Sequence, residues 1–174
     1  MVAYLRCEAA GFIDALRCEL TPGCPHHSHV TVLRPRPLDA DTAELAERCR
    51  QILSRFDSFE IELGDVSVFE STRVIKVSLK SGISELRTLH DILNAGPLAQ
   101  EDDFPFVPHV TLCQEAPPER FDEFLEAARV RWAAYQGSRR VRVESLTLVC
   151  QREDGTWADL AELPLGQPQP VRAF

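Results

Sequence analysis

Two short segments of the chain repeat a pattern of residues suited to acid–base chemistry. Residues 28–32 read SHVTV and residues 108–112 read PHVTL, so the two copies lie 80 positions apart. On a β-strand, residues i and i+2 point to the same face, about 7 Å apart. Each copy therefore presents an imidazole beside a hydroxyl. If the copies face each other, they surround one small group with four side chains: His29, Thr31, His109 and Thr111.

Cleavage of a phosphate ester needs a base for the attacking oxygen, an acid for the leaving oxygen and donors for the phosphoryl charge. Imidazole has an ordinary pKa near 6.5, so one histidine can be neutral while the other carries a proton. The hydroxyls of Thr31 and Thr111 can donate to the non-bridging oxygens. A single strand histidine followed by threonine is normally a surface or core residue. Two at matching repeat positions favour a site built from both.

The repeat extends beyond the two motifs. An amphipathic helix is predicted before each motif, over 12–20 and 83–93, and another after each, over 45–56 and 121–132. Asp41 lies near the start of the helix predicted over 45–56, as a candidate start signal. A strand follows in each half, at 61–68 and 141–148, and both strands show a break in alternation that indicates a β-bulge.

Further strands are predicted at 2–8, 73–80 and 157–163, the last forming a hairpin through the Asp154-Gly155 turn. The pattern is strand–helix–strand–helix–strand, used twice, with an extra strand at the end, which makes about seven strands and four helices. This predicts an α+β protein whose helices cover the outer faces and leave an open sheet surface between two lobes. The tail 166–174 contains Pro168 and Pro170 and is expected to be irregular.

Composition restricts the possible partners. The 174 residues carry a net charge of −8, and three acidic residues at 101–103 precede the second motif, so a long duplex or extended RNA is disfavoured. A small nucleotide or an RNA end remains possible, because only the cleft must be positive. No apolar run is long enough to span a membrane, no signal peptide is evident, and the six cysteines contain no C-x-x-C pair, so we expect a cytoplasmic protein with reduced thiols and no membrane partner. The oligomeric state is not determined.

The chain resembles the 2H phosphoesterase superfamily, and in particular its bacterial 2'-5' RNA ligase and cyclic phosphodiesterase members. The paired H-x-T motifs carry the resemblance, together with FVPHVTL at 106–112, VFE at 68–70 leading to RVI at 73–75, and Asp154-Gly155 followed by Trp157. Ser28 departs from the family, where proline is frequent. The resemblance covers nearly the whole chain. It implies a single domain over 1–174 with two pseudo-repeat lobes, in which two mainly antiparallel sheets form a cleft.

The resemblance also implies a function. It implies a phosphodiesterase in RNA processing that needs no metal or cofactor and acts on 2',3'-cyclic phosphates of nucleotides or RNA ends, or on 2'-5' linkages. By analogy with the family, His109 would be the base towards water and His29 the acid to the leaving 3'-oxygen, with Thr31 and Thr111 beside them. Arg73 is a candidate to bind the phosphate, because an arginine at the similar position often does so in this family, and the alternative is an ordinary solvated arginine at a strand start. Tyr4 and Phe106, with Phe69 and Phe104, are candidates to stack on a base.

Two other hypotheses remain open. A protein of the same fold could hold a phosphate or nucleotide in the cleft without turning it over. The close spacing of Cys24, His26, His27 and His29 could also bind zinc, although no second ligand pair at matching spacing follows. His90 lies on a predicted helix beside leucines and is interpreted as structural. The sequence distinguishes neither the substrate among the cyclic phosphates nor hydrolysis from ligation.

Overall fold

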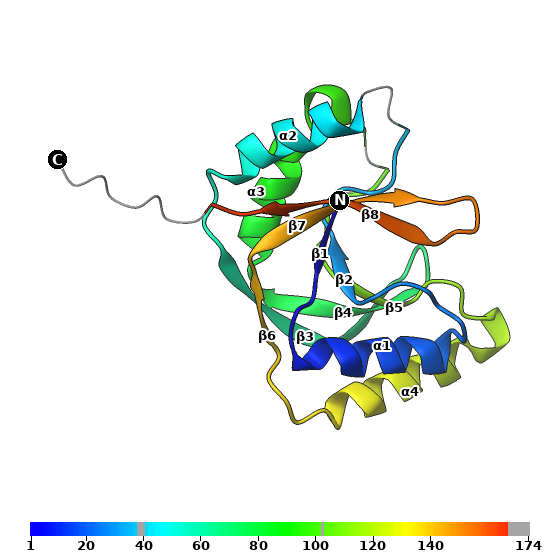
Figure 1. Ribbon diagram of the computed structural model, residues 1–174. Coiled ribbons are helices and arrows are strands. Elements are labelled where there is room, and N and C mark those ends of the chain that lie inside the picture. Colours follow the sequence, from blue (N-terminus) through cyan, green and yellow to red (C-terminus); the bar gives the residue numbers. More distant parts are fainter. Residues whose placement is uncertain (38–40, 102, 167–174) are drawn as a thin grey trace.

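The computed structural model describes residues 1–37, 41–101 and 103–166 (Figure 1). The predicted irregular tail therefore lies almost wholly outside the described residues. The helices are α1 (Glu8–Leu20), α2 (Thr42–Leu53), α3 (Ile83–Leu93) and α4 (Phe121–Ala133). The strands are β1 (Val2–Tyr4), β2 (His29–Thr31), β3 (Phe59–Phe69), β4 (Val74–Ser81), β5 (Val110–Cys113), β6 (Arg140–Val143), β7 (Ser145–Gln151) and β8 (Trp157–Pro164). The predicted α+β class is confirmed.

The strands form one curled antiparallel sheet in the order β6-β3-β4-β5-β2-β1-β7-β8. The two strands that carry the motifs, β2 and β5, are neighbours at its centre. Four strands belong to each side of this junction, so the two expected lobes are the two halves of a continuous sheet. The antiparallel pairing agrees with the predicted architecture, whereas the two expected sheets are the halves of one continuous sheet.

The two halves of the sequence exchange strands between the lobes. The lobe that holds β2 is completed by β1 and by the β7–β8 hairpin from the end of the chain. The lobe that holds β5 is completed by β4, β3 and β6. After β2, the chain forms α2 and then β3, which joins the β5 lobe. After β5, the chain forms α4 and then β6, which also joins the β5 lobe, before β7 enters the β2 lobe. Both halves of the sequence are therefore needed to complete each lobe.

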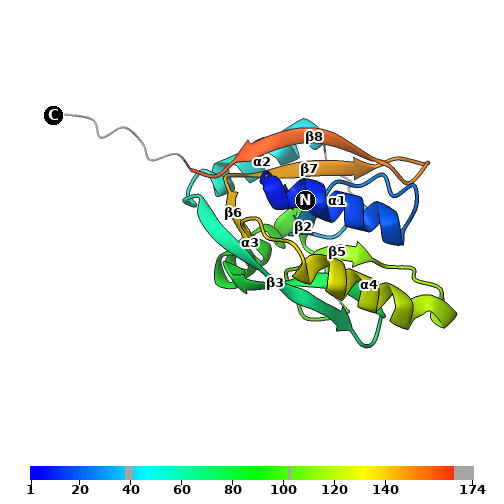
Figure 2. The same cartoon turned by 90° about the horizontal axis from the view of Figure 1, so that it is seen from below.

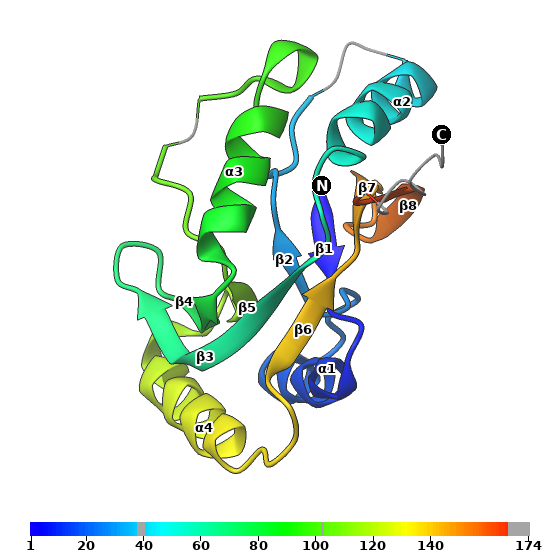
Figure 3. The same cartoon turned by 90° about the vertical axis from the view of Figure 1, so that its left-hand side faces the viewer.

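Helices lie on two sides of the sheet. Figures 2 and 3 show α1 and α4 side by side on one side, and α2 and α3 on the other. The predicted start signal of α2 is confirmed, because the Asp41 carboxylate accepts from the amides of Ala43 and Glu44 at 2.9 and 3.0 Å. None of the helices in the described part of the chain has the length and apolar character that a membrane crossing requires.

Two predicted strands differ from the observed ones. The strand predicted at 2–8 ends at Tyr4, because α1 begins at Glu8 and the intervening residues form its entry. The strand predicted at 141–148 is divided at Glu144 into β6 and β7, which pair with different lobes. The break in alternation that predicted a bulge there thus marks a change of partner. The corresponding bulge in β3, between Leu63 and Val66, is confirmed.

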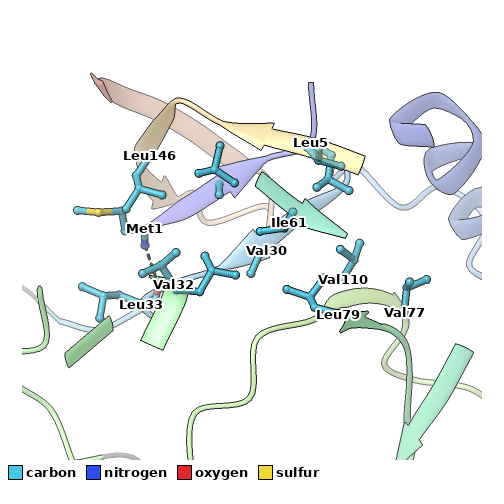
Figure 4. Close-up of a cluster of buried hydrophobic side chains, with 14 of the residues drawn as sticks. Met1, Leu5, Val30, Val32, Leu33, Ile61, Val77, Leu79, Val110 and Leu146 are labelled. Carbon is cyan, nitrogen blue, oxygen red and sulfur yellow. Dashed lines mark hydrogen bonds between the residues drawn. The ribbon is translucent and has the colours of Figure 1, made fainter. Parts of the chain in front are cut away.

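The apolar core extends across the junction of the two lobes. Figure 4 shows Val30 of β2 and Val110 of β5 packed with side chains from neighbouring strands, among them Ile61, Val77 and Leu146. Both valines are fully buried. Because the core uses residues from both lobes, their separation would expose apolar surface at about 25 cal/mol per Å². Burial of this cluster therefore holds the two motif strands together.

Trp132 of α4 should be a major source of stability. Its ring is 2% exposed, and its Nε1 donates to the carbonyl of Gly64 at the β3 bulge, at 2.7 Å. Trp132→Phe should reduce the free energy of unfolding by about 1–3 kcal/mol, because that buried carbonyl loses its donor, and Trp132→Ala by about 3–5 kcal/mol. Urea denaturation followed by circular dichroism measures both. Val130→Ala, on the exposed side of the same helix, is the control, and an equal effect of Val130→Ala would contradict the prediction.

Candidate active site

The register of the central strands brings the two motifs together. Val30 of β2 pairs with Val110 of β5 in an antiparallel ladder. One residue further in each direction, Thr31 stands opposite His109 and His29 stands opposite Thr111. Directly opposed residues share one face of a sheet, with Cβ atoms about 4.5–5.5 Å apart. The four predicted side chains, which come from segments 80 residues apart, therefore form one group.

Burial of the intervening valines determines which face this group occupies. Because side chains alternate along a strand, placing Val30 and Val110 in the core forces the flanking histidines and threonines onto the other face. A slip of one residue would put the valines towards solvent and the imidazoles into the core. The hydrophobic core thus specifies the register of the polar group above it.

Both imidazoles are held in the same way by their own strands. Nδ1 of His29 lies 2.6 Å from the carbonyl oxygen of His27, and Nδ1 of His109 lies 2.8 Å from that of Val107. A carbonyl only accepts, so Nδ1 carries the proton in each ring and Nε2 is left with its lone pair. Within the described residues neither Nε2 has a hydrogen-bond partner. Each ring can therefore accept a proton from a bound ligand, or donate one after being protonated.

Burial keeps both rings neutral in the free protein. His29 is 7% exposed, and desolvation lowers its pKa to about 4, with a smaller effect from the charge of Arg17. Desolvation also lowers the pKa of His109, and the charge of Lys76 acts in the same direction. At neutral pH both imidazoles can act as bases. The ring that acts as an acid must gain its proton when an anion binds.

The two histidines have different neighbours. The ring of Trp157 lies 4.8 Å from that of His29, and the edge of Tyr4 faces it at 6.2 Å. The Tyr4 hydroxyl donates to Asp159 at 2.8 Å, and burial followed by this hydrogen bond raises its pKa to about 12. His109 instead meets the edge of Phe69 at 4.9 Å. The motifs are repeated, but their surroundings are not.

Three hollows follow one another along this face of the sheet. A pocket of about 380 Å³ on the side of His29 is lined by polar groups and Trp157, including Tyr4, His26, Arg152 and Asp159. A pocket of about 340 Å³ on the side of His109 is mainly apolar and is lined by Phe69, Phe104, Phe106 and His90, with Thr31 at its edge. A small hollow of about 30 Å³, which shares Thr31 and Trp157 with its neighbours, lies between them. Thr31 and His109 thus line the apolar pocket, and Trp157, which lies against His29, lines the polar one.

Two of the three predicted substrate-binding residues lie at this group. Tyr4 pairs directly with His29 across β1 and β2. Phe106 lines the apolar pocket and stacks on His90, with centroids 4.1 Å apart. Arg73 follows Ser71 and Thr72, which line the apolar pocket, but is not itself among the residues that line it. It adopts a left-handed conformation with φ 54°, and its guanidinium packs 4.0 Å from the ring of Phe121 at the start of α4.

Sequence reasoning did not assign Lys76 or Trp157 to the site. Lys76 follows Ile75 in β4, pairs with Thr111 and points to the same face as the threonine. No sequence signal distinguished Lys76, because it alternates with the core residues Ile75 and Val77 as an exposed lysine of an amphipathic strand would. Trp157 was noted for its resemblance to the family, but nothing in the sequence placed its ring on His29.

The Cys24–His29 cluster, His90 and the acidic residues at 101–103 have the following contacts in the structure. The thiol of Cys24 accepts from Arg17 at 3.3 Å, and the ring of His26 lies 4.4 Å from Trp157. No group of three or more His, Cys, Asp or Glu side chains that could hold a metal ion occurs in the described ranges. Nδ1 of His90, which was interpreted as structural, lies 2.7 Å from the carbonyl oxygen of Val32, and its ring also lines the apolar pocket. Of the acidic residues at 101–103, Asp103 lies 3.8 Å from Arg34, and Asp102 lies outside the described residues.

Burial of neutral His29 should make folding stability depend on pH. The unfolded chain, with an ordinary pKa of 6.5, binds a proton more readily than the folded protein, with a pKa of about 4. Stability should therefore be full above pH 6.5 and decrease as the pH falls towards 4, by about 2 kcal/mol between pH 7 and 4.5 from this residue. Urea denaturation at the two pH values tests this. His29→Gln should remove that part of the loss and His27→Gln, whose ring is exposed, should retain it. Equal pH dependence in the His29→Gln variant would contradict the pKa.

Comparison with known proteins places this geometry in a family. The family model of the 2'-5' RNA ligase superfamily matches residues 5–155. Two proteins named "Putative phosphoesterase" are similar in sequence. OB1230 of Oceanobacillus iheyensis is 27% identical over 141 residues, or 80% of each chain. BH1439 of Halalkalibacterium halodurans is 24% identical over 153 residues, or 83% of this chain and 85% of the relative.

Solved structures agree on the fold. TT0787 of Thermus thermophilus superposes with a TM-score of 0.67 at 19% identity, covering 96% of this chain and 97% of that one. Escherichia coli LigT complexed with 3'-AMP superposes with a TM-score of 0.62 at 21% identity, covering 95% and 96%. The match of the family model over most of the chain, with the LigT-like fold, identifies the protein as a member of the 2'-5' RNA ligase superfamily, the 2H phosphoesterases.

Proposed function

We propose that the protein is a metal-independent phosphodiesterase that acts on 2',3'-cyclic phosphates of nucleotides or RNA ends, or on 2'-5' linkages. The observation that carries this proposal is the pairing of β2 with β5, which sets each motif histidine opposite the threonine of the other motif. Two imidazoles whose Nε2 atoms have no hydrogen-bond partner among the described residues, together with two hydroxyl donors, are the groups that cleavage of a phosphodiester needs. Membership of the family supports the same chemistry.

The proposed reaction uses one histidine for each proton. Nε2 of neutral His109 takes a proton from the attacking water as its oxygen bonds to phosphorus. The bond from phosphorus to the ribose 3'-oxygen breaks, and Nε2 of protonated His29 gives its proton to that oxygen. Thr31 and Thr111 donate to the non-bridging oxygens, where negative charge gathers. The product is a phosphate monoester, and a proton returned from His109 to His29 through solvent restores the starting state.

A small nucleotide fits the space around these groups. The apolar pocket beside His109 has the size and the aromatic lining, Phe69 and Phe106, that a base requires. The structures of E. coli LigT contain 3'-AMP, phosphate, ATP or NADP⁺. These observations support a nucleotide ligand here, with Tyr4 and Phe106 as proposed contacts. The described surface gives no comparable argument for Arg73, which packs on Phe121.

Hydrolysis of 2',3'-cyclic AMP in the presence of EDTA tests the function directly. His29→Ala and His109→Ala should each reduce kcat/KM by at least about 10²-fold, the low end for general acid–base catalysis. Thr31→Val and Thr111→Val should each reduce it by about 10²-fold through loss of a donor. Thr88→Val, an exposed hydroxyl on α3, is the matched control. Binding of the nucleotide without product would instead support a non-catalytic binding module, and wild-type turnover in either histidine variant would exclude the two-histidine mechanism.

The pH dependence of kcat/KM should be bell-shaped with its optimum below pH 6.5. This parameter reports the free protein, in which burial lowers the pKa values of both histidines. Activity should fall at higher pH because the acid has lost its proton, and at lower pH because the base has gained one. A bound phosphate anion favours the imidazolium, so the optimum of kcat should lie at higher pH than that of kcat/KM. Rates measured from about pH 4 to 9 test this, and an optimum of kcat/KM above about pH 7 would contradict it.

A further inference from the structure

Lys76 is a buried cation with no anionic partner in the described structure. It lies in β4 between Ile75 and Val77 and is 6% exposed. Its Nζ donates to the hydroxyl of Ser67 at 2.7 Å and lies 4.4 Å from the centroid of the Phe69 ring. Neither neighbour carries a negative charge. Burial of a lysine without an anion costs free energy, so an anionic ligand that compensates the charge would stabilise this site.

The position of Lys76 is defined by the sheet. It pairs with Thr111 across β4 and β5 and with Ser67 across β4 and β3, so all three side chains share one face. The Phe69 ring that Lys76 covers also meets His109 edge-on. Lys76 therefore belongs to the same group as the second motif, although it is remote from both motifs in sequence.

The equivalent position in the other lobe holds a different residue. Across β1 and β2, the residue that pairs with Thr31 is Val2. Each motif threonine thus has one cross-strand neighbour on the outer side, a lysine for Thr111 and a valine for Thr31. The two halves of the repeat therefore differ beside the motif threonines, which are the proposed donors to the phosphoryl oxygens.

We infer that Lys76 binds a non-bridging oxygen of the substrate phosphoryl group beside Thr111, and that it draws the negative charge towards the second motif. This inference rests on the proposed function for the identity of the ligand. A cation there gives a charge-assisted hydrogen bond in a desolvated site, which is stronger than a hydroxyl donor alone.

The charge of Lys76 also acts on His109. The charged or titratable side chains near His109 include Lys76 on β4, and Arg34 and His90, which line the same pocket. A cation close to His109 disfavours its imidazolium form and so keeps this ring unprotonated before the substrate binds. His29 has Tyr4 and Trp157 beside its ring, and burial, with a smaller effect from the charge of Arg17, lowers its pKa in the same direction. The assignment of His109 as the base and His29 as the acid therefore stays a prediction from the family resemblance.

Inorganic phosphate is the probe for this inference, with affinity measured by isothermal titration calorimetry at neutral pH. Lys76→Met should weaken binding at least about tenfold through loss of a charge-assisted hydrogen bond. Lys76→Arg, which keeps the charge, should stay closer to wild type than Lys76→Met. Because methionine removes an uncompensated buried charge, Lys76→Met should unfold at the same or a higher temperature than wild type. Lys80→Met, an exposed lysine on the same strand, is the control.

The outcomes separate this inference from the proposed function. Unchanged phosphate affinity in Lys76→Met, or an equal loss in Lys76→Arg and Lys76→Met, overturns the role of the charge even if the wild-type protein hydrolyses 2',3'-cyclic AMP. A loss of affinity in Lys76→Met that Lys76→Arg restores supports that role, even if the wild-type protein fails to hydrolyse the nucleotide. In that case the proposed reaction fails and the anion site stands.

Discussion

The antiparallel contact between β2 and β5 is the interaction on which the rest of this structure depends. It joins the two lobes into one sheet, and its register is specified by burial of Val30 and Val110. The same contact sets the motif histidines and threonines opposite one another. Stability and chemistry therefore share one determinant, since the apolar face of two short strands holds the polar face in place.

The protonation states of the two histidines depend on how far their rings are buried from water. In each imidazole, Nδ1–H donates a hydrogen bond to the carbonyl two residues earlier, which fixes the ring and leaves Nε2 available for a ligand. Burial then favours the neutral form of both rings. In the proposed reaction, a bound anion favours protonation of one histidine, which would couple substrate binding to acid–base catalysis.

The internal repeat builds a similar backbone frame around both motifs, but the side chains around the two histidines differ. The backbone contacts of His29 and His109 match, whereas the residues around them differ: Tyr4 and Trp157 lie at one ring, Phe69 and Lys76 near the other. The hollows on the two sides differ in the same sense, one polar and one apolar. A substrate with two unlike ends would therefore bind in one direction.

The local pattern of apolar and polar residues was enough to predict much of the secondary structure. The sequence alone was enough to predict the four helices, the Asp41 cap, the β3 bulge and the face shared by each histidine and threonine, because these depend on residues within a few positions of one another. Only the tertiary structure decided the exchange of strands between lobes, the turning of Arg73 onto Phe121 and the entry of Lys76 into the site. Those outcomes depend on which distant strands pair and on how a left-handed turn directs a side chain, and packing of the whole chain selects both.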